Sequence, residues 1–534
     1  MIPRRRRTGI PREEESQLSL SDYIAEQVER IRPEDELEAK LSIGKFSDFN
    51  ILLNPTILDL SEGVSENNKI HQFPPDNIME HEEIDYIRNF SRTDSIRYNS
   101  YYDRVYRKNR LSNRVFSNVY QSNVTVRITL SEEIDESGYS KNEIVDNPDV
   151  IRVKRRYTTE YKGCTLFLTH VEGKSEIEIE MKDRNPELFE EAIQDMVNRI
   201  VELQNVMTYY KNMMSPNTRH NPLTTRFLGS MPISYRKAYN LRRYSLKYKF
   251  DGERVNLILF NRRLYLMTRE NGLIFSPVRL KDNQNESELS GIYDAEIIKS
   301  KSNQICFPSE TCPSSKEHYL ILYDLMVDQE ENIMKSPYYR RYRRLTQVMP
   351  VLSENIPNII RSPLMSTESS RIIERRVLNR SVSFRLSGNV ITFMIDGLIL
   401  QDLDSPYITG TDHRLYKWKD QNDITVDFIP VRPRQDTDDS RNEIHLYSEV
   451  LDGDMMVTKS RLSDNPSPDL TIALDNRIVS EFYYDRDRST WIFNRLREDK
   501  NKPNFITTVL DVMESALSYV DISELLEIIQ KDNE

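Results

Sequence analysis

A lysine beside an Asp-Gly turn is the first candidate for chemistry in this sequence. Lys249 stands in KFDGER, at the end of an alternating run, SLKYKF, that predicts a β-strand. A lysine amine can attack phosphorus only when it is neutral, so nearby cations or desolvation must lower its usual pKa of about 10.4. Taken alone, such a string more often marks a surface lysine. Lys247, on the same face of the strand, is a rival nucleophile, which the KxDG spacing disfavours.

Charged residues follow Lys249 in an order that strengthens this prediction. Acidic residues stand in YDAEII, YLILYDLM and FMIDGLIL, and basic residues in YLMTREN and YKWKDQND. Positioning and charge neutralisation supply most of the catalysis in phosphoryl transfer, so both kinds of residue are needed. An ordered set is harder to explain by coincidence than a single motif. The candidates are Arg254, Arg269, Glu296, Asp324, Asp396, Lys417 and Lys419, then Arg497, Asp499 and Lys500 in WIFNRLREDKNKPN.

This ordered set resembles the covalent nucleotidyltransferase superfamily of capping guanylyltransferases and polynucleotide ligases, over roughly residues 225–505. FLGSMPIS resembles the FPGSQPVS of capping enzymes, and WIFNRLREDKNKPN resembles their closing motif, which ligases lack in this form. The resemblance implies that Lys249 takes GMP from GTP as a covalent phosphoramidate.

The resemblance also implies roles for the other residues. Arg254 and Arg269 would hold the ribose and phosphates. Glu296 and Asp396 would bind the sugar edge and a divalent metal, while Lys417 and Lys419 would neutralise the α-phosphate. A mobile OB-fold domain would close over the leaving pyrophosphate, and such lid motions often gate turnover. Its residues would be Arg497, Asp499 and Lys500.

Charged residues also alternate along strands of the N-terminal third. Two glutamates two positions apart on a strand point the same way and are suited to bind a divalent metal. A solvated face is the ordinary explanation for any one such strand, but here acids and bases lie on different strands. The acids are Glu36 and Glu38 in ELEAKL and Glu176, Glu178 and Glu180 in SEIEIEM; the bases are Arg152, Lys154 and Arg156 in IRVKRRY and Arg127 in VTVRITL.

These strands resemble the tunnel-type RNA 5'-triphosphatases of fungi and large DNA viruses, over roughly residues 34–182. The resemblance implies a closed eight-stranded antiparallel barrel with a charged interior. Glu36, Glu38, Glu176, Glu178 and Glu180 would bind a catalytic magnesium or manganese ion that orients the γ-phosphate for attack by water. Arg127, Lys154 and Arg156 would grip the triphosphate. Phe167 stands where the family often has an acidic residue, so one secondary contact is expected to be missing.

The predicted fold is an α+β multidomain protein: an N-terminal antiparallel β-barrel tunnel, a mixed α/β nucleotidyltransferase domain and a C-terminal OB-fold β-barrel. A chain of 534 residues suggests three or four domains. Residues 47–113, rich in Asn, Asp and Ser, are predicted to be loops or insertions. The expected parts are an arm and helix at 1–33, the tunnel at 34–215, the nucleotidyltransferase at 216–425, the OB-fold at 426–505 and a helix at 506–534.

Composition narrows the class of protein further. A net charge of −11 disfavours a general polyanion binder, so any RNA must bind at a local site. Cys164, Cys306 and Cys312 lack both a disulfide framework and paired zinc spacing, which indicates a reducing compartment. There is no membrane-length apolar run and no secretory signal after the basic N-terminus, which is expected to be a disordered arm. We expect a soluble, cytoplasmic protein, in a viral factory or virion if its source is a large DNA virus.

The leading hypothesis is a bifunctional capping enzyme that acts on the 5' end of nascent RNA and uses GTP as substrate. Related viral enzymes continue into a methyltransferase domain, so here a separate methyltransferase is expected, alongside RNA polymerase, as a partner. One alternative is an ATP-dependent polynucleotide ligase with an unrelated N-terminal domain. Another is an inactive scaffold that binds a polymerase or RNA, against which the intact Lys249, Asp396, Lys417 and Arg497 count.

Overall fold

The computed structural model shows two compact units. One is formed by the described residues up to 214 and the other by those from 228 onward, with β13 (Leu273–Arg279) divided between them. The described residues are 19–33, 35–43, 79–90, 94–171, 174–214, 228–238, 241, 243–268, 273–279, 290–299, 318–356, 358–365, 370–386, 389–433, 443–451, 453–461, 466–485, 488–498 and 500–531. No helix in these ranges is both long and apolar enough to cross a membrane.

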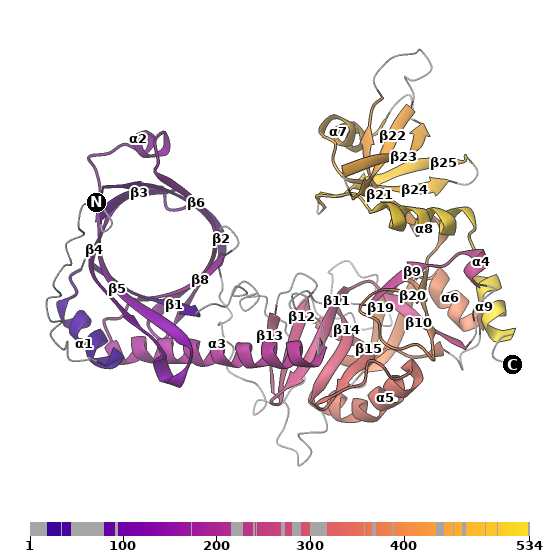
Figure 1. Cartoon of the computed structure of the whole chain (residues 1–534), viewed down its shortest axis with the longest axis horizontal. Helices are drawn as coiled ribbons and strands as arrows, with labels where there is room; N and C mark the ends of the chain where they lie inside the picture. The colour runs from indigo at the N-terminus through magenta and orange to yellow at the C-terminus, as the bar shows by residue number, and fades with distance from the viewer. Residues whose placement is uncertain are drawn as a thin grey trace, which may run out of the picture. The chain divides into compact units, whose positions relative to one another are not determined.

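The first unit contains a closed barrel of eight antiparallel strands, seen end-on in Figure 1. Its strand order is β1-β5-β4-β3-β2-β6-β7-β8. The predicted antiparallel barrel is therefore confirmed, but the prediction of loops over 47–113 is wrong from residue 79 onward, since β2, β3 and most of β4 lie there; residues 47–78 lie outside the described residues. The strands are β1 (Asp35–Ile43), β2 (Met79–Asn89), β3 (Asp94–Asn99), β4 (Arg104–Phe116), β5 (Val124–Asp135), β6 (Val150–Tyr161), β7 (Cys164–Val171) and β8 (Lys174–Met181).

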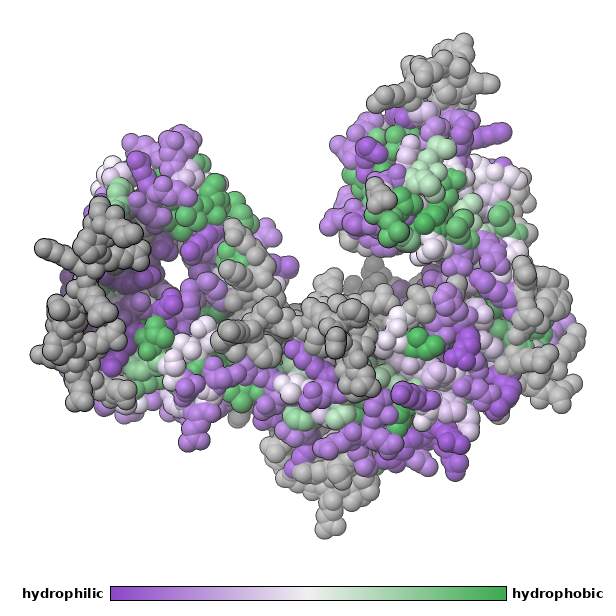
Figure 2. Space-filling model, viewed as in Figure 1, coloured by the Kyte–Doolittle hydropathy of each residue, from purple (hydrophilic) through white to green (hydrophobic). Residues whose placement is uncertain are grey.

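The apolar face of this barrel points outward. The long helix α3 (Pro186–Met214) packs against β5, β7 and β8, and α1 (Leu20–Arg30) packs against α3. Side chains such as Leu37, Ile128 and Ile179 are fully buried beneath these helices. Because side chains alternate along a strand, the residues between them face the inside of the barrel. The space-filling view shows the barrel open through its centre, with a largely hydrophilic rim (Figure 2).

Two short helices complete the first unit. α2 (Lys141–Val145) begins with a capping box at Ser140 and Glu143, and packs Ile144 against the outward-facing Ile96 and Tyr98 of β3. η3 (Val119–Gln121) is a 3₁₀ turn between β4 and β5. The inward-facing residues of β3 are thus the polar ones between Ile96 and Tyr98 and on either side of them.

The second unit begins with two sheets, consistent with the predicted mixed α/β architecture. One sheet has the order β10-β19-β20-β9, with β18 paired to β19; the other has the order β13-β12-β11-β14-β15-β16, with β17 paired to β15. The helix α5 packs on β15 and β17, and α6 on β18 and β19. Tyr248, Phe250 and Leu257 are fully buried in the core.

The bounds of these elements are β9 (Leu228–Pro232), α4 (Tyr235–Ala238), β10 (Tyr244–Phe250), β11 (Glu253–Phe260), β12 (Arg263–Thr268), β14 (Gly291–Lys299), β15 (His318–Asp328), β16 (Glu331–Asn332), α5 (Tyr338–Asn355), β17 (Ile359–Arg361), α6 (Ser370–Leu378), β18 (Ser381–Leu386), β19 (Asn389–Asp402), β20 (Gly410–Trp418) and the 3₁₀ turn η6 (Gln421–Asp423).

A five-stranded sheet of order β23-β22-β21-β24-β25 follows. Phe428, Phe482 and Trp491 form its core, and Val509 and Val512 of α8 complete it. The expected single C-terminal helix is two helices, since the chain leaves helical geometry at Ser518. The elements are β21 (Thr425–Val431), β22 (Glu443–Val450), β23 (Gly453–Arg461), α7 (Pro468–Asn476), β24 (Ser480–Asp485), β25 (Thr490–Leu496), α8 (Ile506–Leu517) and α9 (Ile522–Lys531).

Candidate active sites

A β-bulge brings Lys249 to Asp396. The register of β10 and β19 shifts between Tyr248 and Phe250, so that Lys249 lies opposite the Asp396-Gly397 pair. Lys249 Nζ is 2.5 Å from Asp396 Oδ2, and Lys419 Nζ, just beyond β20, is 2.8 Å from the same oxygen. Three of the predicted residues therefore meet at one carboxylate.

The Asp396 carboxylate is held in its charged form. Burial acts to raise its pKa, but the ammonium groups of Lys249 and Lys419 outweigh burial, and its pKa lies below the ordinary value. About a quarter of each of these three side chains is exposed. The cluster is thus both charged and open to a ligand.

Glu296 accepts two hydrogen bonds from within the protein. Its Oε1 accepts the Gly252 N–H at 2.8 Å and its Oε2 accepts the Tyr323 hydroxyl at 2.7 Å, while burial raises its pKa. A Cβ at Gly252 would lie 2.5 Å from the Ile297 carbonyl oxygen and 2.9 Å from Glu296 Cγ. In this structure Glu296 therefore fixes the turn of KFDGER, and its contact with the sugar edge or a metal stays a prediction.

Arg254 has a buried partner that the sequence did not reveal. Its guanidinium forms a bidentate ion pair with Asp294, with Nε 2.5 Å from Oδ1, and lies 4.7 Å from the centre of the Tyr323 ring. Asp294 lies two residues before Glu296 on β14, and the strand register places Glu296 opposite Arg254 on β11. Asp324 is likewise engaged, through a bidentate pair with Arg341 at 2.9 and 3.0 Å. Both acidic residues are therefore held by internal ion pairs.

Lys247, the rival nucleophile, is buried. Only 2% of its surface is exposed, and its Nζ lies 3.1 Å from both the Tyr338 hydroxyl and Gln401 Oε1. Desolvation lowers its pKa to about 7. A lysine enclosed in this way cannot reach a nucleotide, so the geometry favours Lys249 as the nucleophile.

Gly397 offers a test of the bulge that holds Asp396. Its φ is +123°, and a Cβ there would lie 2.1 Å from the Trp418 carbonyl oxygen. We expect Gly397→Ala to lower the free energy of unfolding by about 2–4 kcal/mol, because backbone strain and overlap add. Gly410 is the matched control: its φ is +98° with nothing within 4 Å of a Cβ. Gly410→Ala should cost only about 1–2 kcal/mol; equal losses in urea unfolding would contradict the crowded bulge.

The remaining predicted residues that the structure describes have other neighbours than Asp396. Lys417 pairs with Ile399 of β19 and with Pro232 of β9, which places it beside the FLGSMPIS segment. Arg497 and Lys500 meet at the buried Asp427 of the C-terminal sheet, with Arg497 Nη1 3.0 Å from Oδ1. Arg269 and Asp499 lie outside the described residues.

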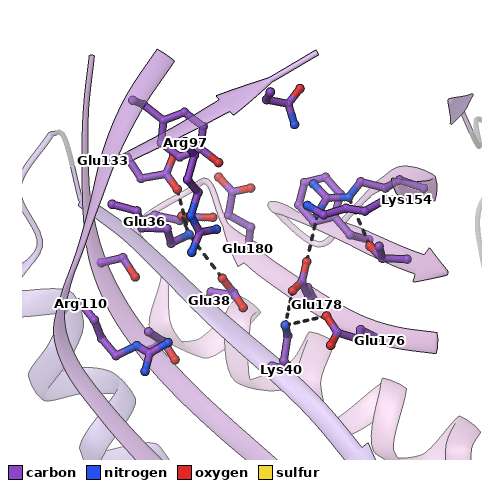
Figure 3. A pocket seen from close by; sticks show the side chains of 18 of the residues that line it. Glu36, Glu38, Lys40, Arg97, Arg110, Glu133, Lys154, Glu176, Glu178 and Glu180 are labelled. Atoms are coloured by element: carbon purple, nitrogen blue, oxygen red, sulfur yellow. Dashed lines mark hydrogen bonds and ion pairs between the residues drawn. The ribbon is translucent and has the colours of Figure 1, made fainter. Parts of the chain in front are cut away.

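The barrel encloses a charged cavity of about 670 Å³, shown from close by in Figure 3. All five predicted metal-binding glutamates line it, as do the three predicted triphosphate-binding residues. The residues are Glu36, Glu38, Glu176, Glu178 and Glu180, and Arg127, Lys154 and Arg156. The structure therefore brings both sets together in one chamber.

The glutamates are crowded against one another on one side of this chamber. β1 and β8 pair so that Glu38 lies opposite Glu180. Burial, and then the charge of Glu36, raises the pKa of Glu180 to about 7; burial, and then the charge of Glu178, raises the pKa of Glu38 to about 6. A raised pKa means that the charged form of the carboxylate is disfavoured, and a bound cation would stabilise that charged form.

Lysines neutralise these acids in the structure. Lys108 Nζ lies 2.6 Å from Glu36 and 2.8 Å from Glu133, and Lys40 Nζ lies 2.6 Å from Glu178 and 2.9 Å from Glu176. Within the described ranges no three acidic, histidine or cysteine groups converge as metal ligands. The donors are nonetheless hard carboxylate oxygens, the type that magnesium and manganese prefer.

The cations of the chamber also have acidic partners. Lys154 contacts Glu83 at 3.1 Å and also Asp85, and Arg156 contacts Glu83 at 3.3 Å and Glu178 at 3.4 Å. Arg156 also lies 4.7 Å from the centre of the Phe167 ring. A cation–π contact thus occupies the place of the acidic residue that the family pattern led us to expect.

Sequence reasoning missed the inward-facing residues of β2, β3 and β4. They follow the same period of two as the residues that were recognised, in HEEID, SIRYN and RVYRKNR, so the signal was present. It was hidden because a strand that is polar on its inner face and only partly apolar outside resembles a loop in composition. The residues concerned include Glu83, Asp85, Arg97, Asn99 and Lys108, with Glu133 on β5.

Glu180 provides a pH test of this crowding. A carboxyl whose pKa is raised from 4.5 to about 7 in the folded protein destabilises it increasingly as pH rises from about 4.5 through 7. We therefore expect Glu180→Gln to stabilise the metal-free protein by about 1–3 kcal/mol at pH 8 and by less at pH 5. Thermal unfolding with a chelator measures this; a stability gain that does not grow with pH would contradict the crowding.

Comparisons with known proteins match the chain from residue 179 to residue 526. Residues 179–421 match the mRNA capping enzyme catalytic domain, and residues 413–526 match the mRNA capping enzyme C-terminal domain. The mRNA-capping enzyme subunit alpha of Yarrowia lipolytica is 24% identical over 339 residues, covering 58% of this chain and 83% of the relative. The protein of that name from Schizosaccharomyces pombe is 25% identical over 340 residues, covering 56% and 79%.

Solved structures resemble the chain only distantly. An RNA triphosphatase of S. pombe, in complex with the Spt5 CTD, matches with 17% identity and a TM-score of 0.24, covering 38% of this chain and 93% of that chain. A score of this size assigns no activity. The sequence matches are more informative: residues 179–526 carry the catalytic and C-terminal domains of an mRNA capping enzyme.

Proposed function

We propose that the chain is a bifunctional mRNA 5'-capping enzyme that removes the γ-phosphate from triphosphate RNA and then joins GMP to the resulting diphosphate end. The observation that carries the guanylyltransferase is the meeting of Lys249, Asp396 and Lys419 within the capping catalytic domain. Facing glutamates and cations in one closed barrel support the triphosphatase. The product would be a GpppN end.

In the transferase, Lys249 Nζ forms a bond to the α-phosphorus of GTP, the bond to the β-phosphate oxygen breaks, and pyrophosphate leaves. An oxygen of the diphosphate RNA end then bonds to the same phosphorus, and the N–P bond breaks to regenerate the amine. The proton of Lys249 must leave before attack, and Asp396 Oδ2, 2.5 Å from Nζ, is an acceptor within reach of it. Lys419 supplies positive charge beside the reacting phosphate.

The carboxylate donors at both proposed sites suit a divalent cation by their chemistry. Magnesium in nucleotide sites is often held by one or two carboxylates plus substrate phosphates, so Asp396 would hold it in the transferase. In the barrel, Glu36, Glu38 and Glu180 would hold it. The ion would polarise the phosphate when bound. Lys154, Arg156 and Arg127 would bind the remaining phosphate charge, while Glu83 and Asp85 keep the first two in place.

The two activities form a sequence, because transfer of GMP needs a diphosphate end and the barrel would produce one. The RNA end is then the partner that both activities share. RNA polymerase would act before these two reactions, and a separate cap methyltransferase would act after them. A polynucleotide ligase would use ATP instead, and both matched domain models are of capping enzymes.

Incubation with α-labelled GTP or ATP and a divalent metal, followed by denaturation, tests the transferase. We expect label on the protein from GTP, released on adding diphosphate RNA and prevented by a chelator. Labelling from ATP with sealing of a nicked duplex would instead establish a ligase. Release of phosphate from γ-labelled triphosphate RNA tests the barrel independently.

A further inference from the structure

The hairpin turn between β3 and β4 presents two exposed tyrosines at one end of the barrel. Tyr101 is 50% exposed and Tyr102 is 56% exposed, and Tyr102 also lines the charged chamber. Two half-exposed tyrosines side by side offer an aromatic surface with a polar edge to a ligand at this end of the barrel. From this arrangement, and resting on the proposed triphosphatase, we infer that Tyr102, supported by Tyr101, stacks on the first base of the triphosphate RNA.

The two rings are supported from behind by a third. The His81 ring is stacked on Tyr101, with ring centres 3.9 Å apart and an angle of 21°, and Tyr101 meets Tyr102 edge-on at 4.9 Å and 86°. The His81 side chain is only 8% exposed, and its Nε2 faces Glu83 Oε2 at 3.6 Å, just beyond hydrogen-bond distance. A buried imidazole held beside Glu83 and stacked on Tyr101 supports the tyrosine pair by packing.

The turn itself is fixed before any ligand arrives. Asn99 Oδ1 accepts the backbone N–H groups of both Tyr101 and Tyr102 at 3.0 Å, and Asn99 Nδ2 donates to Glu83 at 3.1 Å and to Asp85 at 2.7 Å. Ser100 also forms two bonds with the backbone of Ile84, at 2.7 and 3.0 Å. A preformed surface loses little conformational entropy on binding, as a recognition site requires.

The same side chains connect the turn to the cations of the chamber. Glu83, which receives the Asn99 hydrogen bond, also contacts Lys154 at 3.1 Å and Arg156 at 3.3 Å. A triphosphate bound at these cations would leave its nucleoside toward the end of the barrel where Tyr102 lies. Aromatic rings bind unpaired bases by stacking irrespective of sequence, which suits an enzyme that must accept many transcripts.

The test compares two substrates, of which only one has a base. Tyr101→Ala combined with Tyr102→Ala should raise KM for triphosphate RNA roughly ten-fold and leave KM for inorganic tripolyphosphate unchanged. Tyr102→Trp should keep the wild-type KM for RNA, because it retains a stacking surface. Phe90→Ala is the matched control, since Phe90 is 46% exposed on the same barrel but follows β2 at its opposite end. Equal changes on both substrates, or none on RNA, would overturn the stacking proposal.

A binding measurement separates this proposal from the activity on which it rests. Triphosphate RNA with 2-aminopurine as its first base should lose fluorescence on binding the wild-type protein and not on binding the double variant. If the wild-type protein released no phosphate from either substrate, the triphosphatase would fail while the quenching still tested the stacking. Absence of quenching with the wild type would overturn the base-binding role directly.

Discussion

Lys249→Arg is expected to abolish labelling of the protein by α-labelled GTP, by at least about 1,000-fold, because it removes the nucleophile. Arginine keeps the positive charge and can still bond Asp396, but its guanidinium is not deprotonated at any working pH. The fold and the ion pair at 2.5 Å should therefore survive while the chemistry is lost. Gel labelling measures the loss of chemistry, and unchanged thermal unfolding shows that the fold survives. Phosphate release from triphosphate RNA should remain at the wild-type level.

Lys247→Met is the control for this result. Methionine has a similar length and suits the enclosed position between Tyr338 and Gln401, where the lysine is 2% exposed. We expect this variant to keep labelling within about ten-fold of the wild type. Loss of labelling in Lys247→Met together with full labelling in Lys249→Arg would show that the nucleophile had been assigned to the wrong lysine.

Glu36→Ala should produce the opposite pattern: phosphate release from triphosphate RNA falls by at least about 1,000-fold and GMP labelling is unaffected. The substitution removes one oxygen donor from the crowded glutamates and leaves Lys108 with Glu133 at 2.8 Å. The ammonium group of Lys108 would then lie where the metal is proposed to bind. Release of labelled phosphate at several magnesium and manganese concentrations measures both the rate and the metal requirement.

Glu82 supplies the matched control for Glu36. It is an exposed glutamate on β2, next to the inward-facing Glu83, and alternation places it on the outside of the barrel. Glu82→Ala should leave both activities unchanged. If it lowered phosphate release as strongly as Glu36→Ala, loss of negative charge in general, rather than a site inside the barrel, would explain the effect.

The parts of the fold that could be predicted are those whose pattern is strong within a few residues. ELEAKL and SEIEIEM alternate strictly, so β1 and β8 and their inward glutamates were recognised without any knowledge of their pairing. Helix α3 was recognised because apolar residues recur with a helical period after Pro186. Each of these signals is local and needs no partner strand.

What could not be predicted depends on partners distant in sequence. Asp427 holds Arg497 and Lys500 from some seventy residues away, and Asp294 holds Arg254 from forty residues away. Nothing near Asp427 or Asp294 in the sequence marks these pairings, because strand register sets them. The internal contacts of Glu296 could not be predicted for the same reason, since its hydrogen bond to Gly252 arises only once β11 and β14 are paired.

The barrel closes where its first strand pairs with its last, so closure must come late in folding. β1 completes the ring by pairing with β8 over only Glu38–Leu41 and Ile177–Glu180, so the first strand made by the ribosome must wait for the last. Contacts so far apart in sequence form slowly. Until β1 and β8 pair, α3 does not cover their outward apolar faces. The glutamates on the two strands repel each other across the open gap. Divalent cations, or a chaperone that shields this edge, should therefore speed refolding more than they raise the final stability.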